Sequence, residues 1–141
     1  NYLDELNTWR DKQVIKVITG IRRCGKSTLM SQYKNMLIES GVEPSQIQSL
    51  NFEELENEQY LEYHALYNHL KSNLIEGKMN YIFLDEVQMV KDFQKAIDSL
   101  FVKPNIDIYL TGSNAYMLSG EIATLVSGRY VEIKIFPDDI H

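Results

Sequence analysis

The sequence lacks a second cysteine, a long apolar run and an excess of positive charge. Its single cysteine, Cys24, cannot form an internal disulfide, which agrees with a reducing compartment, and we expect a cytoplasmic protein. No apolar run approaches the roughly 18 residues of a membrane span, and no signal-peptide core is present, so no membrane partner is expected. The formal net charge of −6 argues against a chain that coats nucleic acid by electrostatics alone, although a local basic patch stays open.

The composition is typical of one globular domain. The 141 residues are 44% hydrophobic and 24% charged, which is enough to bury one core but not two. No repeat, low-complexity stretch or long linker divides the sequence. We therefore assign residues 1–141 to a single domain.

The strongest motif is the stretch GIRRCGKST. It contains two glycines followed by a lysine and a serine at the spacing of the Walker A pattern. The glycines let the backbone curl so that its N–H groups face a phosphate chain. Lys26 then supplies a positive charge for the β and γ phosphates, and Ser27 supplies a hydroxyl for Mg²⁺. The predicted nucleotide-binding residues are Gly20, Ile21, Arg22, Arg23, Cys24, Gly25, Lys26, Ser27 and Thr28.

The segments around this loop alternate between strand and helix patterns. Residues 14–18 form a short β-branched run typical of a buried parallel strand, and residues 29–37 carry apolar side chains at helical spacing. Further strands are predicted at 47–52, 81–84, 106–110 and 130–136, and further helical segments at 2–9, 61–74, 93–101 and 115–126. Five strands that alternate with helices predict an α/β fold, in which a parallel sheet carries helices on both faces.

The predicted strand at 81–84 runs directly into two acids, Asp85 and Glu86. In an open α/β sheet the ligand lies at the carboxyl ends of the strands, so we expect these acids on the same rim as the phosphate loop. Asp85 suits a Mg²⁺ ligand that acts through the water shell of the metal. Glu86 suits the general base that polarises an attacking water, and Lys26 is predicted as a further catalytic residue through its charge on the phosphates. The alternative is a strand that simply ends in two solvated acids.

Polar residues also follow the predicted strand at 106–110. The cluster contains Thr111, Ser113 and Asn114. An amide at this rim could hold the attacking water or contact the γ-phosphate, so Asn114 is predicted as a further catalytic residue. The alternative is an ordinary turn and helix cap, because glycine, serine and asparagine are common in both.

Taken in this order, the motifs resemble those of the AAA-type P-loop ATPases. The stretches ITGIRRCGKSTL, YIFLDEVQ, LTGSN and SGRY are most similar to a prokaryotic AAA group whose ATPase domain precedes an uncharacterised C-terminal region. The resemblance implies the three-layer sandwich of P-loop NTPases, with a five-stranded sheet of order 5-1-4-3-2. It also implies ATP rather than GTP, since the guanine-reading Asn-Lys-x-Asp motif has no counterpart here. Residues 51–54 lie at the end of the second strand and could approach the rim of the site, but in that order this strand is the far edge, so Glu53 and Glu54 are expected to be solvated.

The same resemblance implies parts that lie beyond this sequence. AAA proteins normally continue into a small helical lid, whereas this sequence ends just past the fifth predicted strand. We therefore expect an ATPase core from a longer protein, with a protein or DNA partner reached through the missing C-terminal region and with assembly into a homo-oligomer left open. Arginine at the place of Arg129 is often a finger that reaches the ATP of a neighbouring subunit. A structural arginine is the alternative.

The expected function is Mg²⁺-dependent ATP hydrolysis, coupled to a conformational change in a partner or in the absent region. Two other functions stay open. A small-molecule kinase would share the Walker A loop, but Glu86 offers a base suited to water, and no arginine-rich lid follows to exclude water from the site. A nucleotide-binding switch or DNA-associated module would hold ATP and hydrolyse it rarely, and Glu86 again favours hydrolysis.

Overall fold

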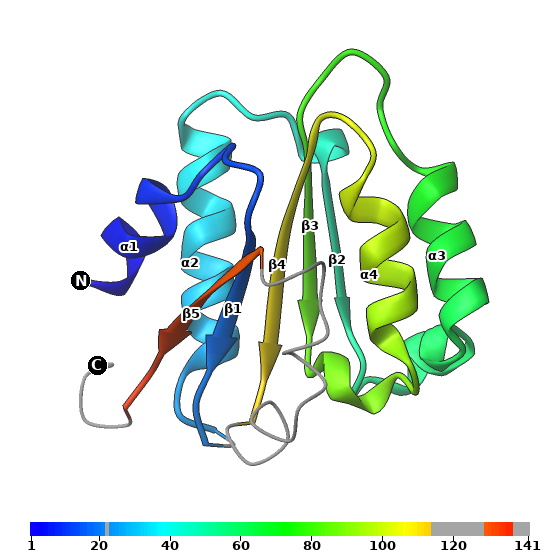
Figure 1. Cartoon of the computed structure of the whole chain (residues 1–141). Helices are drawn as coiled ribbons and strands as arrows, with labels where there is room; N and C mark the ends of the chain where they lie inside the picture. The colour runs from blue at the N-terminus through cyan, green and yellow to red at the C-terminus, as the bar shows by residue number, and fades with distance from the viewer. Residues whose placement is uncertain (22, 114–128, 137–141) are drawn as a thin grey trace.

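The strands of the protein form one parallel sheet. A computed structural model of the chain describes residues 1–21, 23–113 and 129–136, and in it the strands lie in the order β2-β3-β4-β1-β5 (Figure 1). This order confirms the predicted 5-1-4-3-2 arrangement. The strands are β1 (Ile15–Thr19), β2 (Ile47–Asn51), β3 (Asn80–Asp85), β4 (Ile106–Gly112) and β5 (Tyr130–Lys134).

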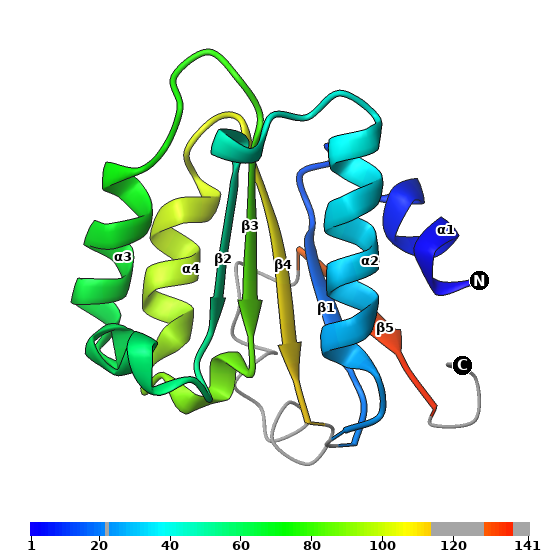
Figure 2. The same ribbon diagram turned by 180° about the vertical axis from the view of Figure 1, so that it is seen from behind.

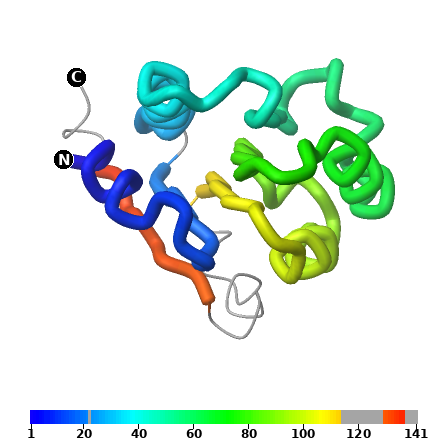
Figure 3. Tube along the Cα trace, turned by 90° about the horizontal axis from the view of Figure 1, so that it is seen from above, coloured from blue at the N-terminus to red at the C-terminus, as the bar shows by residue number. Residues whose placement is uncertain are grey.

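Helices cover both faces of this sheet, as the alternating pattern predicts. In the view from behind, α2 lies on the viewer's side of the sheet (Figure 2), and the view from above shows that α2 and α4 lie on opposite sides of the strands (Figure 3). The α-helices are α1 (Tyr2–Thr8), α2 (Lys26–Glu39), α3 (Tyr63–Ser72) and α4 (Phe93–Phe101). Three short 3₁₀ segments, η1 (Pro44–Gln46), η2 (Leu55–Leu61) and η3 (Val87–Met89), complete the described elements. None of the helices in the described ranges combines the length and the apolar composition that a membrane span requires.

The core consists of two clusters, one on each face of the sheet. Alternate side chains of each strand point to opposite faces, so neighbouring residues of β1 enter different clusters. Ile15 and Val17 pack with buried residues of α3 and α4, whereas Ile18 packs with buried residues of α1 and α2. The strand β3 is buried along its whole length, whereas in β5 only Ile133 is buried, which agrees with its place at the edge of the sheet.

The parallel arrangement brings the carboxyl ends of β1, β3 and β4 to one rim. Thr19 lies opposite Gly112, and Leu84 lies opposite Leu110. The phosphate loop follows β1 and the two acids follow β3, so both predicted motifs start from this rim. The predicted helical segment at 115–126 lies outside the described residues.

Candidate functional site

The loop between β1 and α2 depends on its two glycines for different reasons. Gly25 has a φ of 106°, a left-handed conformation that residues with a Cβ rarely adopt, and it caps the start of α2. A Cβ on Gly20 would lie 2.4 Å from Cys24 Sγ and 3.0 Å from the carbonyl oxygen of Ile135. Gly25 therefore supplies a backbone conformation, and Gly20 supplies space where the loop passes the end of β5.

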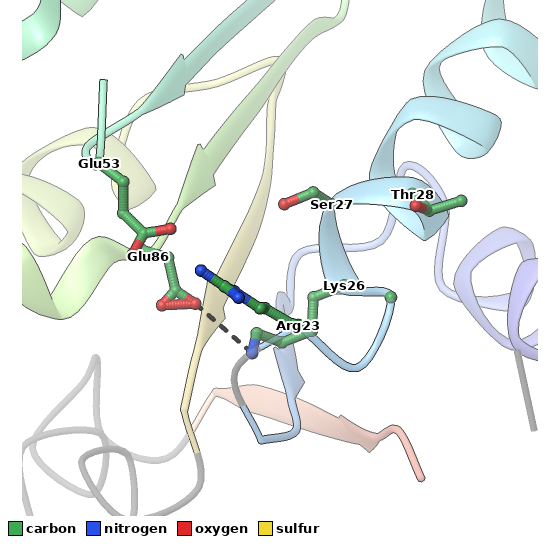
Figure 4. A pocket seen from close by; sticks show the side chains of 7 residues that line it. Arg23, Lys26, Ser27, Thr28, Glu53 and Glu86 are labelled. Atoms are coloured by element: carbon green, nitrogen blue, oxygen red, sulfur yellow. Dashed lines mark ion pairs between the residues drawn. The ribbon is translucent and has the colours of Figure 1, made fainter. Parts of the chain in front are cut away.

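Lys26 is held at the mouth of this loop. Its side chain is buried, and its Nζ donates hydrogen bonds to the carbonyl oxygens of Gly20 at 2.7 Å and Ile21 at 3.1 Å. The same Nζ lies 3.4 Å from Glu86 Oε1 (Figure 4). The ammonium group thus has a fixed position between the phosphate loop and the second acid.

Asp85 and Ser27 meet directly at the rim. Ser27 Oγ donates a hydrogen bond to Asp85 Oδ2 at 2.5 Å, and Thr111 Oγ1 donates to Asp85 Oδ1. Thr111 Oγ1 also accepts a hydrogen bond from the backbone N–H of Glu86 at 2.9 Å. Thr111 of β4 therefore orients Asp85 and fixes the start of the turn that carries Glu86. The sequence pattern at 111–114 predicted polar residues at this rim, but it did not predict these contacts of Thr111.

Glu86 occupies an unusual backbone conformation. Its φ is 57° and its ψ is 51°, in the left-handed region where a residue with a side chain is strained by roughly 1–3 kcal/mol. The carboxylate is buried and contacts two groups, since Oε1 lies near Lys26 and Oε2 accepts a hydrogen bond from Gln88 Nε2 at 2.9 Å. Such strain persists only where surrounding contacts hold the residue, and it concentrates at functional sites.

A pocket of about 320 Å³ opens between the phosphate loop, Glu53 and Glu86. In Figure 4 the side chain of Arg23 extends toward Glu53 and Glu86. Arg23, Gly25, Lys26, Ser27, Thr28, Glu53 and Glu86 line the pocket. It is mostly built from the predicted loop residues and from one of the two predicted acids.

Glu53 is a lining residue that was not among the predicted site residues. It is exposed, as expected, and it also borders the pocket, which agrees with the alternative that the end of the second strand approaches the rim. The cause is the strand register, since Asn51 lies opposite Asp85 and the backbone N–H of Phe52 donates to the carbonyl oxygen of Asp85 at 3.1 Å. The implied strand order already placed the second strand next to the third, so the end of the second strand could have been predicted to lie near Asp85 and Glu86.

Other predicted residues do not reach the pocket or cannot be placed. Arg129 precedes β5, and its carbonyl oxygen accepts a hydrogen bond from the N–H of Ile15, at the end of β1 far from the loop. Arg22 and Asn114 lie outside the described residues. Within the described part of the chain, no group of three or more His, Cys, Asp or Glu side chains is arranged to hold a metal ion.

The glycine loop, the buried lysine and the acids at one rim of a parallel sheet define a P-loop site. Comparison with known families agrees, because the pattern of an AAA domain matches residues 12–141. The chain therefore belongs to the AAA family of P-loop ATPases, which confirms the resemblance and implies nucleotide binding.

Two relatives are longer proteins. An uncharacterised protein of Haemophilus influenzae is 44% identical over 138 residues, which cover 97% of this chain and 34% of the relative. An uncharacterised protein of Methanocaldococcus jannaschii is 32% identical over 128 residues, which cover 87% of this chain and 26% of the relative. The chain therefore spans about a third or less of the length of these relatives.

Solved structures share the fold at low sequence identity. A DNA polymerase III gamma subunit-related protein of Thermotoga maritima has a TM-score of 0.68 at 12% identity, over 96% of this chain and 46% of that protein. PCH-2 of C. elegans has a TM-score of 0.65 at 15% identity, over 95% of this chain and 40% of that protein. The large terminase of a thermophilic bacteriophage, in complex with ADP, has a TM-score of 0.58 at 15% identity, over 97% and 45%. These likenesses show the fold alone.

Proposed function

We propose that this chain binds ATP with Mg²⁺ in the pocket and hydrolyses the terminal phosphate. Hydrolysis would drive a conformational change in a partner or in another region of a longer protein. The observation that carries the proposal is the convergence of Lys26, Ser27 and Glu86 at one pocket, with Asp85 hydrogen-bonded to Ser27 beside it. The three groups at the pocket would bind the phosphates, hold Mg²⁺ and accept a proton from water, respectively.

The phosphate chain would lie against the loop at 20–25. Backbone N–H groups at the start of α2 and the positive end of its dipole favour negative charge there. Lys26 is held beside this space by two loop carbonyl oxygens, and its ammonium group would contact the β and γ phosphates. Arg23 and Thr28 border the same space and are proposed as further contacts to the nucleotide.

The Ser27–Asp85 pair fits a Mg²⁺ site. A hydroxyl and a carboxylate supply the hard oxygen ligands that Mg²⁺ prefers, and this ion usually keeps several waters and binds few protein groups. Ser27 would hold the ion directly, and Asp85 would hold it through water. When bound, the ion neutralises charge that develops on the β and γ oxygens.

Glu86 would act as the general base. Its carboxylate lines the pocket and lies next to Lys26, the group proposed to hold the terminal phosphates. In the proposed step a water oxygen forms a bond to the γ-phosphorus, the bond to the bridging oxygen of ADP breaks, and Glu86 accepts the proton of the water. Asn114 is proposed to orient this water or the γ-phosphate from the end of β4. A base beside the phosphate position favours hydrolysis over transfer to another acceptor or passive storage of ATP.

Substitution of Lys26 and Glu86 separates binding from hydrolysis. Lys26→Ala should lower ATP affinity by about 10- to 100-fold, since a charge-assisted hydrogen bond contributes roughly 1.5–3 kcal/mol. Glu86→Gln should keep ATP bound and lower kcat by roughly 10²- to 10⁴-fold, since the amide cannot accept the proton. Equilibrium nucleotide binding and phosphate release measure the two effects.

The other carboxylate at the pocket provides a matched control. Glu53→Gln changes the same functional group at the rim, and it should lower kcat much less than Glu86→Gln. Unimpaired ATP binding by the Lys26→Ala protein would contradict the phosphate assignment. Equal losses from the two glutamate substitutions would contradict the assignment of Glu86 as the base.

A further inference from the structure

Gln88 touches the carboxylate of Glu86 from the following 3₁₀ turn. Its Nε2 donates a hydrogen bond to Glu86 Oε2 at 2.9 Å. The other contact of this carboxylate is longer, since Lys26 Nζ lies 3.4 Å from Oε1, beyond the usual 2.7–3.2 Å of an N–H···O hydrogen bond. The hydrogen bond from Gln88 is therefore the shorter of the two contacts, and it orients the Glu86 carboxylate.

The oxygen of the Gln88 amide, Oε1, indicates why the amide is oriented with its nitrogen toward Glu86. Among the described residues, Gln88 Oε1 is buried and has no hydrogen-bond partner, a state shared with Gln94 Oε1. A buried amide oxygen without a partner is unfavourable. Turning the amide over would place this oxygen against Glu86 Oε2, where two acceptors repel each other. The amide thus keeps its donor on the glutamate and leaves its own acceptor without a partner.

The backbone around Gln88 is anchored on both sides. Val87 and Val90 are fully buried in the core under α3 and α4, and the N–H of Met89 donates to the carbonyl oxygen of Glu86 at 3.1 Å. These contacts fix the turn η3, so Gln88 has a defined position relative to Glu86.

We propose that Gln88 is a positioning residue for ATP hydrolysis, because its amide holds Glu86 Oε2 and thereby turns Oε1 toward the pocket. When phosphates bind Lys26, the contact of Lys26 with Oε1 weakens, and this oxygen becomes available to the attacking water. The Gln88 hydrogen bond keeps the carboxylate in place through that exchange. This inference rests on the proposed role of Glu86 as the base.

The test is the substitution Gln88→Met in the full-length protein, with Gln94→Met as the matched control. Methionine has a similar length but cannot donate a hydrogen bond, and both substitutions remove a buried oxygen that lacks a partner. Gln88→Met should lower kcat by roughly 10- to 100-fold, part of the range expected for general-base catalysis, with KM for ATP nearly unchanged. Gln94→Met should change neither constant. The Tm of Gln88→Met should fall no further than that of Gln94→Met.

A second background separates this inference from the proposed function. In the Glu86→Gln protein, Gln88→Met should cause no further loss of kcat, because the base it positions is gone. If Glu86→Gln hydrolyses ATP at the normal rate, the proposed function fails, and the role of Gln88 fails with it. If Glu86→Gln is inactive but Gln88→Met keeps full kcat, only the role of Gln88 is wrong. If Gln88→Met and Gln88→Leu both fail to fold while Gln94→Met folds, Gln88 is a structural residue and the proposal is also wrong.

Discussion

At the scale of single residues, two neighbouring atoms limit the space for a side chain at Gly20, and they differ in how easily they can move. Cys24 Sγ is the end of a small side chain, whereas the carbonyl oxygen of Ile135 belongs to the backbone after β5. The backbone is tied to β1, because the N–H of Ile135 donates to the carbonyl oxygen of Thr19 at 2.7 Å. A side chain at Gly20 would therefore displace the loop more easily than it would displace the sheet.

Gly20→Ala should consequently destabilise the protein by about 1–3 kcal/mol and weaken nucleotide binding, since overpacking displaces neighbouring groups. Adding Cys24→Ala removes the sulfur 2.4 Å from the new Cβ and should recover part of the loss. Recovery should be incomplete because the Ile135 oxygen remains 3.0 Å away. Urea unfolding and nucleotide titration of the single and double variants measure the coupling. Strictly additive effects would show that Cys24 does not limit the space at Gly20.

The residues of the candidate site differ in how far the sequence could predict them. Lys26, Ser27, Asp85 and Glu86 follow fixed spacings from strand ends, so topology alone brings them to one rim. The contact between Gln88 and Glu86 depends instead on the left-handed conformation of Glu86 and the short turn after it. Apolar periodicity contains no information about a single strained residue, so this contact could not be predicted.

At the scale of elements, a buried ion pair joins β1 to β4. Lys16 Nζ contacts Asp107 Oδ1, and both side chains are almost fully buried. Asp107 Oδ2 also accepts hydrogen bonds from the N–H of Asp11 at 3.0 Å and from Tyr109 OH at 2.8 Å. Burial lowers the pKa of Lys16 and raises the pKa of Asp107, while their mutual attraction opposes both shifts. The sequence predicts β1 from its apolar run, but the ion-pair partner of Lys16 lies 91 residues further along the chain.

The two members of this pair should differ in their effect on stability. Asp107→Leu removes the counter-charge of the buried Lys16 ammonium, which then keeps only the carbonyl oxygen of Lys12 as an acceptor at 2.9 Å, and it also removes the acceptor of the Asp11 N–H, so it should cost about 3–5 kcal/mol. Lys16→Met should cost less, because Asp107 keeps the N–H of Asp11 and the hydroxyl of Tyr109 as donors. Urea unfolding should show this order, and the double variant should lose less than the sum of the single losses. An equal cost for both single variants would mean that the two extra donors contribute nothing.

At the scale of the whole molecule, the order and direction of the strands determine which residues of the chain can reach its own pocket. The layers and strand order were predictable because strand and helix periods alternate regularly and the motifs resemble one family. The partner and the oligomeric state leave no such pattern in these residues. Arg129 is the residue on which this question can be tested, because it is exposed and precedes β5.

Arg129 lies at the end of β5 opposite the phosphate loop. Ile15 lies opposite Tyr130 and Thr19 lies opposite Lys134, so the length of β1 separates Arg129 from the loop. Arg129 is therefore level with residue 14, six residues before Gly20, and at about 3.3 Å per residue it lies on the order of 20 Å from Gly20, beyond the reach of an arginine side chain. A catalytic role within the same chain is therefore excluded by distance. A role in catalysis requires a neighbouring subunit whose pocket faces this end of the sheet.

If Arg129 completes the site of a neighbour, Arg129→Ala should bind ATP normally and lower turnover by roughly 10³-fold or more in the assembled protein. Mixing it with Glu86→Gln should restore some activity, because a mixed interface can pair an intact pocket from one variant with an intact arginine from the other. Sedimentation with ATP and phosphate release from the mixture test both points. A full-length protein that stays monomeric with ATP and hydrolyses it at an undiminished rate after Arg129→Ala would leave Arg129 with a structural role, in which its backbone carbonyl aligns β5 with β1.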